Sequence, residues 1–163
     1  MVRLNFFAAS ANSTLKDPHS FIRPFEEPVS VTRSNDNFLR IQWQEPADRT
    51  IIRVGPNPND LALMASVVSV CEAREAVVTG LNPAVRHYFA LEFRGGAWDG
   101  RSILAAERIL PLQKGVNFRD AGGMYTQDGR MERWGRLYLD GSLSHLTQAD
   151  LGYLQGLKLK VVF

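Results

Sequence analysis

The only thiol in this chain stands in a setting that does not suit catalysis. The 163 residues contain one cysteine, Cys71. A cysteine nucleophile needs a stabilised thiolate, usually beside a cation or a ring of backbone N–H groups. Cys71 is followed instead by Glu72 and then Glu75, and no histidine or glycine adjoins it. Negative neighbours disfavour a thiolate. We therefore expect an inert structural cysteine, and no catalytic residue is assigned.

Histidine does not supply a metal centre either. The chain contains three histidines, His19, His87 and His145. They are far apart in the sequence and show no spacing typical of metal ligands. His87 begins a run in which every second residue up to Phe93 is apolar, so its imidazole is expected to point inward and to bond backbone. We expect no metal and no cofactor.

The most distinctive polar stretch is residues 117–123, which read Asn-Phe-Arg-Asp-Ala-Gly-Gly. Consecutive glycines allow backbone angles that other residues avoid. A phosphate-cradling loop is one interpretation of such a stretch. However, the spacing differs from the G-x-G-x-x-G and G-x-x-x-x-G-K-[ST] motifs, and a hairpin signal rather than a helix follows. The phosphate-loop interpretation is therefore disfavoured.

The same stretch resembles the opening of the bacterial cysteine-dependent protein tyrosine/serine phosphatases, which typically read Asn-Phe-Arg-Asp-Leu-Gly-Gly. The resemblance implies hydrolysis of phosphomonoesters through a phosphocysteine, without a metal. It also implies supporting roles beside the active site for Asn117, Arg119, Asp120, Gly122 and Gly123. The family's His-Cys-x-x-Gly-Lys-Asp-Arg loop does not occur in this sequence. We therefore expect an inactive N-terminal fragment, with a phosphorylated substrate bound only by a complete enzyme.

A second segment departs from the family pattern. Residues 137–141 read Leu-Tyr-Leu-Asp-Gly, where the family usually has Leu-Tyr-Arg-Ser-Gly. Leu139 replaces a cation expected near the phosphate, and Asp140 adds a negative charge where an anionic substrate would approach. Phosphate binding is expected to be impaired even in a complete domain.

The elements before this region follow the pattern of an antiparallel β-sandwich. Short alternating runs separated by turn residues predict seven strands, at 29–33, 38–44, 50–55, 61–70, 75–79, 86–94 and 101–109. In the second strand Leu39, Ile41 and Trp43 share one face. The Gly-rich segment 94–100 carries Trp98, and it is either a recognition loop or, as the sequence favours, a plain hairpin loop.

Residues 81–88 sharpen this assignment. They resemble the Leu-x-Pro-x-x-x-Tyr corner of fibronectin type III domains, although His87 occupies the tyrosine position and Tyr88 follows it. Together with Trp43, the resemblance covers about residues 28–111. It implies a fibronectin type III-like sandwich.

The C-terminal segment predicts a hairpin, a helix and a strand. Residues 127–129 form a turn signal between two short runs. Thr147 and Asp150 have the spacing of a capping box, and Leu151, Leu154 and Leu157 give an apolar stripe before a helix end near Gly156. Residues 157–163 read as a buried strand of a parallel sheet. A strand without neighbours is expected to fold back on the sandwich, to bind a missing C-terminal half or, as we favour, to pair with the same segment of a second molecule.

These observations give a mainly β chain. We expect a leader at 1–28, the sandwich at 29–111, and at 112–163 a β-hairpin, helix and strand that begin an incomplete α/β phosphatase domain. The boundary at 111–115 is short, so the two parts should touch. An alternative function is a non-enzymatic interaction module, because β-sandwiches host many functions.

Composition also limits the possible partners and the cellular compartment. A formal net charge of +2 without charge blocks argues against nucleic-acid partners, and no apolar run is long enough to span a membrane. A lone cysteine excludes an internal disulfide, which favours the cytoplasm.

Overall fold

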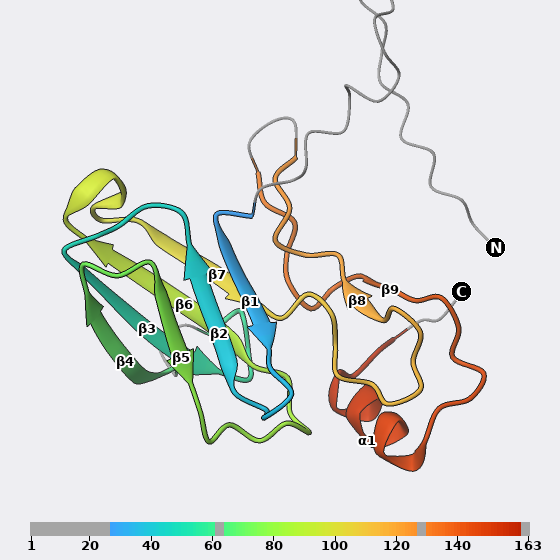
Figure 1. The fold of residues 1–163 in the computed structure, drawn as a ribbon. Helices are drawn as coiled ribbons and strands as arrows, with labels where there is room; N and C mark the ends of the chain where they lie inside the picture. The colour runs from blue at the N-terminus through green and yellow to red at the C-terminus, as the bar shows by residue number, and fades with distance from the viewer. Residues whose placement is uncertain (1–26, 61–63, 127–129, 161–163) are drawn as a thin grey trace, which may run out of the picture.

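The computed structural model describes residues 27–60, 64–126 and 130–160 (Figure 1). Nearly all of the expected leader therefore lies outside the described residues. Within 27–106, leaving out 61–63, the structure has seven strands, which are β1 (Val29–Arg33), β2 (Leu39–Trp43), β3 (Arg49–Gly55), β4 (Ala65–Cys71), β5 (Glu75–Val78), β6 (Tyr88–Arg94) and β7 (Ser102–Ala106). They correspond to the predicted strands, with somewhat different ends.

The strands form two antiparallel sheets that pack face to face. One has the order β1-β2-β5 and the other β4-β3-β6-β7 (Figure 1). In β2 the side chains of Leu39, Ile41 and Trp43 are buried, and those between them are exposed, as the period of two predicted. The Trp43 ring meets Phe93 of the opposite sheet edge-on at 6.2 Å. The core of the sandwich lies between the two sheets.

The loop between β6 and β7 is folded back on the sandwich. A short 3-10 turn, η2 (Gly96–Trp98), places the Trp98 ring edge-on to Phe93 at 5.0 Å. The segment joins the paired strands β6 and β7, as expected of the favoured hairpin loop, and Trp98 is buried rather than exposed for recognition. Gly95 and Gly96 both have positive φ, which lets the chain reverse and bring Trp98 back to the core.

The C-terminal part is smaller and less regular. It contains a two-stranded sheet, β8 (Arg119–Asp120) with β9 (Tyr138–Leu139), and one helix, α1 (Gln148–Gly156). Residues 124–126 and 130–132 pair in antiparallel fashion through a bridge between Tyr125 and Met131. The flanks of the predicted hairpin are thus confirmed, while its turn at 127–129 lies outside the described residues.

Helix α1 begins as predicted, and two of the three predicted apolar residues, Leu154 and Leu157, pack against the C-terminal core. Thr147 and Asp150 form the expected capping box. Leu151, however, is exposed, and the buried side chains of the helix are Asp150 and Tyr153. The predicted leucine stripe is therefore wrong at Leu151, because the helix packs through Tyr153 against the buried Phe118.

The expected C-terminal strand is not present in its described part. Residues 157–160 have no strand structure, and Lys158 takes a left-handed backbone conformation at φ 53°. Such a conformation ends an extended or helical run. Residues 161–163 lie outside the described residues.

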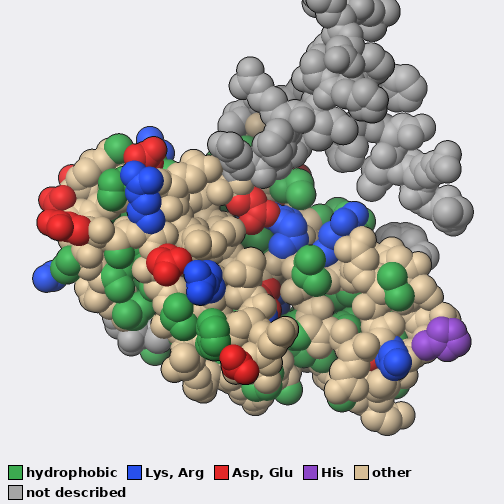
Figure 2. Space-filling view, viewed as in Figure 1, with side chains coloured by type: hydrophobic (Ala, Val, Ile, Leu, Met, Phe, Trp, Pro, Cys, Tyr) green, Lys and Arg blue, Asp and Glu red, His purple; other side chains and the backbone are tan. Residues whose placement is uncertain are grey.

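The two parts touch, as the short boundary predicted. Trp134 of the C-terminal part packs on the outer surface of the four-stranded sheet, against Met64, Tyr88, Ala90 and Ala106. On the face shown in Figure 2, acidic and basic side chains are interspersed. Nowhere in the described ranges does a helix have the length and apolar character needed to cross a membrane.

Candidate functional site

The phosphatase-like motif forms a loop at the joint between the two parts. We call residues 117–123 the Asp120 loop. Phe118 and Asp120 are buried, while Asn117 and Arg119 between and beside them are exposed. Phe118 stacks on Tyr138 with ring centroids 5.4 Å apart. The loop thus turns alternate side chains inward and outward.

Asp120 organises the interior of the loop. Its side chain is fully buried. Oδ1 accepts a hydrogen bond from Gly122 N at 2.9 Å, and Oδ2 accepts one from Gly135 N at 2.9 Å. Arg86, a residue of the sandwich just before β6, donates to Oδ2 from Nη2 at 3.1 Å. One carboxylate therefore ties together the loop, the segment after Trp134 and the sandwich.

The charge of Arg86 is maintained despite burial. Its side chain is only 5% exposed. Burial opposes the charged form, but the Asp120 carboxylate outweighs it and raises the pKa of Arg86 above its ordinary value. The guanidinium also lies 5.3 Å from the centre of the Tyr88 ring. The pair is thus a buried, charged contact across the joint.

A second arginine holds the loop backbone. Arg108 donates from Nη1 to the Asp120 carbonyl oxygen at 2.7 Å and from Nη2 to the Gly122 carbonyl oxygen at 2.9 Å. Its Nε pairs with Glu27, and its guanidinium lies 5.0 Å from the centre of the Trp134 ring. Glu27, just before β1, and Arg108, just after β7, are therefore brought together beside the loop.

The two motif glycines allow Trp134 to approach. A Cβ added at Gly122 would lie 2.5 Å from the Trp134 Cα, and one added at Gly123 would lie 2.2 Å from the Trp134 ring. Gly123 also has φ +74°, a conformation that side chains rarely adopt. Glycine is needed at both positions by this packing.

Other ionisable groups at the joint are held neutral or paired. Burial, followed by the neighbouring Tyr88, raises the pKa of Tyr138, and burial raises the pKa of Tyr153 to about 12. Arg33 and Glu107 form a two-pronged ion pair at 2.7 and 2.6 Å. Burial and then Arg33 lower the pKa of His87.

His87 is less buried than the sequence predicted. It is only half-buried, and its Nδ1 has no hydrogen-bond partner among the described atoms. The following residue, Tyr88, is the one buried against Trp134. A backbone hydrogen bond with Val85 nevertheless acts on the imidazole and opposes the lowering of its pKa by burial, which agrees with the predicted bonding to backbone.

The remaining candidate residues lie away from the loop interior. Cys71 is the last residue of β4 and is exposed, so it does not serve as a buried packing residue. Leu139 and Asp140, which depart from the family pattern, are exposed at the end of β9. The described residues contain no group of three or more His, Cys, Asp or Glu side chains suited to a metal ion.

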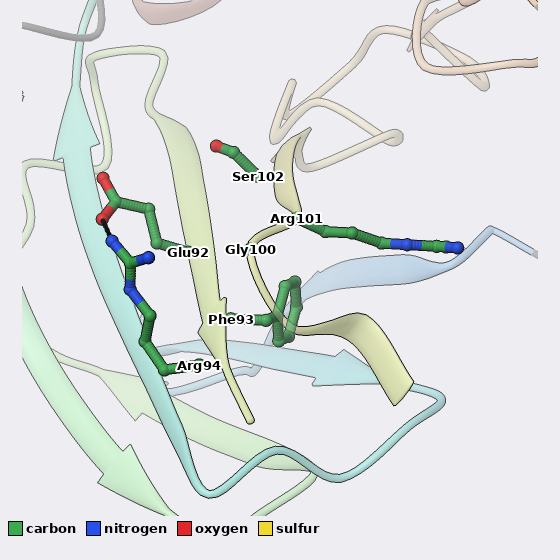
Figure 3. A pocket seen from close by; sticks show the side chains of 6 residues that line it. All are labelled: Glu92, Phe93, Arg94, Gly100, Arg101 and Ser102. Carbon is green, nitrogen blue, oxygen red and sulfur yellow. Dashed lines mark ion pairs between the residues drawn. The ribbon is translucent and has the colours of Figure 1, made fainter. Parts of the chain in front are cut away.

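Two shallow pockets occur outside the loop. One of about 280 Å³ lies at the β6–β7 end and is lined by Glu92, Phe93, Arg94, Gly100, Arg101 and Ser102. Its Glu92 and Arg94 pair at 3.8 Å, whereas Arg101 points away from them (Figure 3). The other, of about 270 Å³, lies between the sandwich and the hairpin beside Trp134. Neither pocket is lined by a residue of the phosphatase-like motif at 117–123.

Sequence reasoning found the loop but missed its partners. The structure brings Asp120, Gly122 and Gly123 together, and leaves Asn117 and Arg119 at the surface. Arg86, Arg108 and Trp134 were not singled out. Their sequence signal is weak, since arginine before a strand is usually exposed and the sequence does not show which distant surface buries a tryptophan.

Comparison with known proteins agrees with the motif. A model described as the tyrosine phosphatase family matches residues 110–163. A search of curated proteins found no match. The matched region includes the Asp120 loop, β8, β9 and α1, and begins close to the predicted boundary. The part of the chain that follows the sandwich is therefore related to a tyrosine phosphatase family.

Proposed function

We propose that this chain is the N-terminal portion of a protein tyrosine/serine phosphatase. A fibronectin type III-like sandwich at 29–111 precedes the start of the catalytic domain at 112–163. The observation that carries the proposal is the match of residues 110–163 to the tyrosine phosphatase family. The motif at 117–123 lies within the matched region and agrees with it.

The fibronectin-like assignment is supported by strand order and by the corner segment. Seven antiparallel strands divided three and four suit a small sandwich of this class. Leu81 of the corner packs against the core between the sheets. Tyr88 contacts Trp134 on the outer side instead, so the corner is a variant of the usual pattern.

The reaction proposed for the complete enzyme is phosphomonoester hydrolysis. A cysteine thiolate attacks phosphorus and the alcohol leaves, and water then releases phosphate from the phosphocysteine. The family's cysteine loop is absent from this sequence, so the chain by itself is proposed to be inactive. In the complete enzyme, the buried Asp120, Gly122 and Gly123 would support the Asp120 loop from within. The exposed Asn117 and Arg119 would face the active site.

Two measurements test the proposal. In the phosphatase family, an Asp-Leu-Arg motif follows the strand that corresponds to residues 158–163. Reading the coding sequence after the Phe163 codon should reveal this motif and then the His-Cys-x-x-Gly-Lys-Asp-Arg loop. The purified chain should hydrolyse an aryl phosphate no faster than buffer, with or without Cys71→Ser. Turnover that disappears when Cys71 is alkylated would overturn it. Absence of the loop downstream would favour the alternative, a non-enzymatic interaction module.

A further inference from the structure

We infer that the outer surface of the four-stranded sheet is an internal docking surface for Trp134, against which Gly122 and Gly123 of the Asp120 loop pack, and that Arg86 is the residue that positions the loop. The outer surface is formed by Met64, Tyr88, Ala90, Leu104 and Ala106. The docking itself is independent of the proposed function. Its relevance to phosphoester hydrolysis rests on that function.

The first part of β6, Tyr88 to Leu91, is buried on both faces. Phe89, Leu91 and Phe93 point into the sandwich core, as expected for one side of a strand. Tyr88 and Ala90 alternate with them and point outward, yet both are also buried. A strand covered on both faces in an antiparallel sandwich needs a layer outside the sheet. The C-terminal part supplies this layer.

The outer surface of the four-stranded sheet also fits the Trp134 side chain. The alanines Ala90 and Ala106 leave room beside Tyr88 for the indole, which is 4% exposed. The Trp134 Nε1 donates to the Leu104 carbonyl oxygen at 3.0 Å. Packing holds the Trp134 ring against the sheet, and the hydrogen bond fixes the orientation of the ring. Trp134 in turn occupies the space that Gly122 and Gly123 leave open.

A buried ion pair also joins the loop to the sandwich. Among the described residues, Arg86 is the cation that pairs with the Asp120 carboxylate, and both side chains are almost completely buried. Removing one partner of a buried pair leaves a charge without compensation, which is strongly unfavourable. Arg108 contacts the loop through carbonyl oxygens, so it does not replace Arg86 at the carboxylate. The loop conformation therefore depends on Arg86.

This dependence crosses the boundary of the family match. Arg86 lies in the sandwich, outside the matched region at 110–163. The geometry of a phosphatase-type motif is thus held by a side chain that the family region does not contain. The sandwich acts as a scaffold for the loop rather than as an independent binding module.

The three tryptophan indole N–H signals in an NMR spectrum of the full chain provide the test. Trp134 reports on the joint, and Trp43 reports on the sandwich core. We expect Arg86→Met to shift the Trp134 signal and to speed amide exchange of Gly122 and Gly135 at least about tenfold, while the Trp43 signal is unchanged. Arg86→Lys, which keeps the charge, should restore much of the protection.

A matched control is Arg53→Met, which breaks an ion pair with Glu92 on the same sheet away from the loop. It should leave all three indole signals and both amides unchanged. Asp120→Asn, made on the loop side, should reproduce the Trp134 shift with Trp43 intact.

Unchanged exchange at Gly122 and Gly135 in Arg86→Met would overturn the inference. So would simultaneous loss of the Trp43 and Trp134 signals in both Arg86→Met and Asp120→Asn, since the pair would then be a general folding determinant. The proposed function would survive either result, because its own tests are the downstream sequence and the phosphatase assay.

Discussion

At the scale of single residues, the joint depends on two glycines, which have no side chain, as much as on its charged residues. Asp120 gathers two backbone N–H groups and one arginine at its carboxylate. This is possible only because Gly122 and Gly123 let the Trp134 backbone and ring come within a distance that any Cβ would block. Charge and close packing therefore act at the same few atoms.

Gly123→Ala tests the packing, with Gly100→Ala as its matched control. Both glycines have nearly the same φ, +74° and +73°, but a Cβ at Gly100 would have no neighbour within 4 Å. Each alanine pays about 1–2 kcal/mol for the left-handed backbone. Gly123→Ala should lose a further 1–3 kcal/mol or so from overpacking against Trp134. Equal losses in urea unfolding would contradict the close approach.

Trp43→Ala tests the register of the sandwich core. The side chain is 4% exposed and lies between the sheets. Its removal should lower the free energy of unfolding by about 3–5 kcal/mol. Val77→Ala on the adjacent strand β5 is the control, since Val77 is 45% exposed and should change stability by less than about 0.5 kcal/mol. A loss of under about 1 kcal/mol for Trp43→Ala would place the ring at the surface.

At the scale of elements, local patterns were predictable and contacts between distant segments were not. Alternation along β2 gave the face of Trp43, and the Thr147–Asp150 spacing gave the start of α1, because both depend on neighbours in sequence. The buried face of α1 was missed at Leu151. That face is set by residues far away in the chain, which single-sequence periodicity does not contain.

The same limit applies to the candidate site. The motif at 117–123 was visible because its residue types are unusual in combination. Its partner Arg86 lies 34 residues before Asp120 in the sequence. Nothing local distinguishes Arg86 from the many exposed arginines of the chain. Long-range pairing of this kind becomes visible only when the fold brings the two segments together.

The Asp150 carboxylate makes the helix start sensitive to acid. It accepts hydrogen bonds from the backbone N–H groups of Gln113 at 2.6 Å, Lys114 at 3.1 Å and Thr147 at 3.0 Å. Burial opposes its ionisation, but these bonds and that of Thr147 Oγ1 outweigh burial and lower the pKa of Asp150. The depressed pKa means that its stabilisation is present above the unfolded pKa of about 4 and is lost as pH falls below it.

We therefore expect the amide signals of Gln113 and Thr147 to move together when the pH falls from about 6 to about 2. Asp150→Asn should remove this transition, because the amide has no comparable charge to lose. Asp140→Asn, at an exposed position, should leave it intact. An unchanged titration in Asp150→Asn would show that another group controls these amides.

At the scale of the whole molecule, the described surface leaves apolar side chains uncovered on one side of the C-terminal part. Ile109 pairs with Arg119, and Arg119 pairs with Leu139, so these three side chains share one face of a small sheet. Ile109 is 67% exposed and Leu139 is 38% exposed. Exposed apolar groups beside a short sheet favour association with another chain.

Two surfaces could mediate such association, and substitutions separate them. Self-association through residues 157–163 stays a prediction, although residues 157–160 do not form the expected strand and Leu157 and Leu159 pack on the C-terminal core. Deleting 160–163 keeps Leu157 and Leu159, which pack with α1, so the helix should remain folded. Light scattering over a range of concentrations should show dimers for the intact chain and monomers after this deletion. Leu139→Lys should have a smaller effect, and Val77→Lys on the sandwich should have none.

A chain that stays monomeric throughout, or a dimer that survives the deletion but not Leu139→Lys, would move the association surface away from the C-terminal segment.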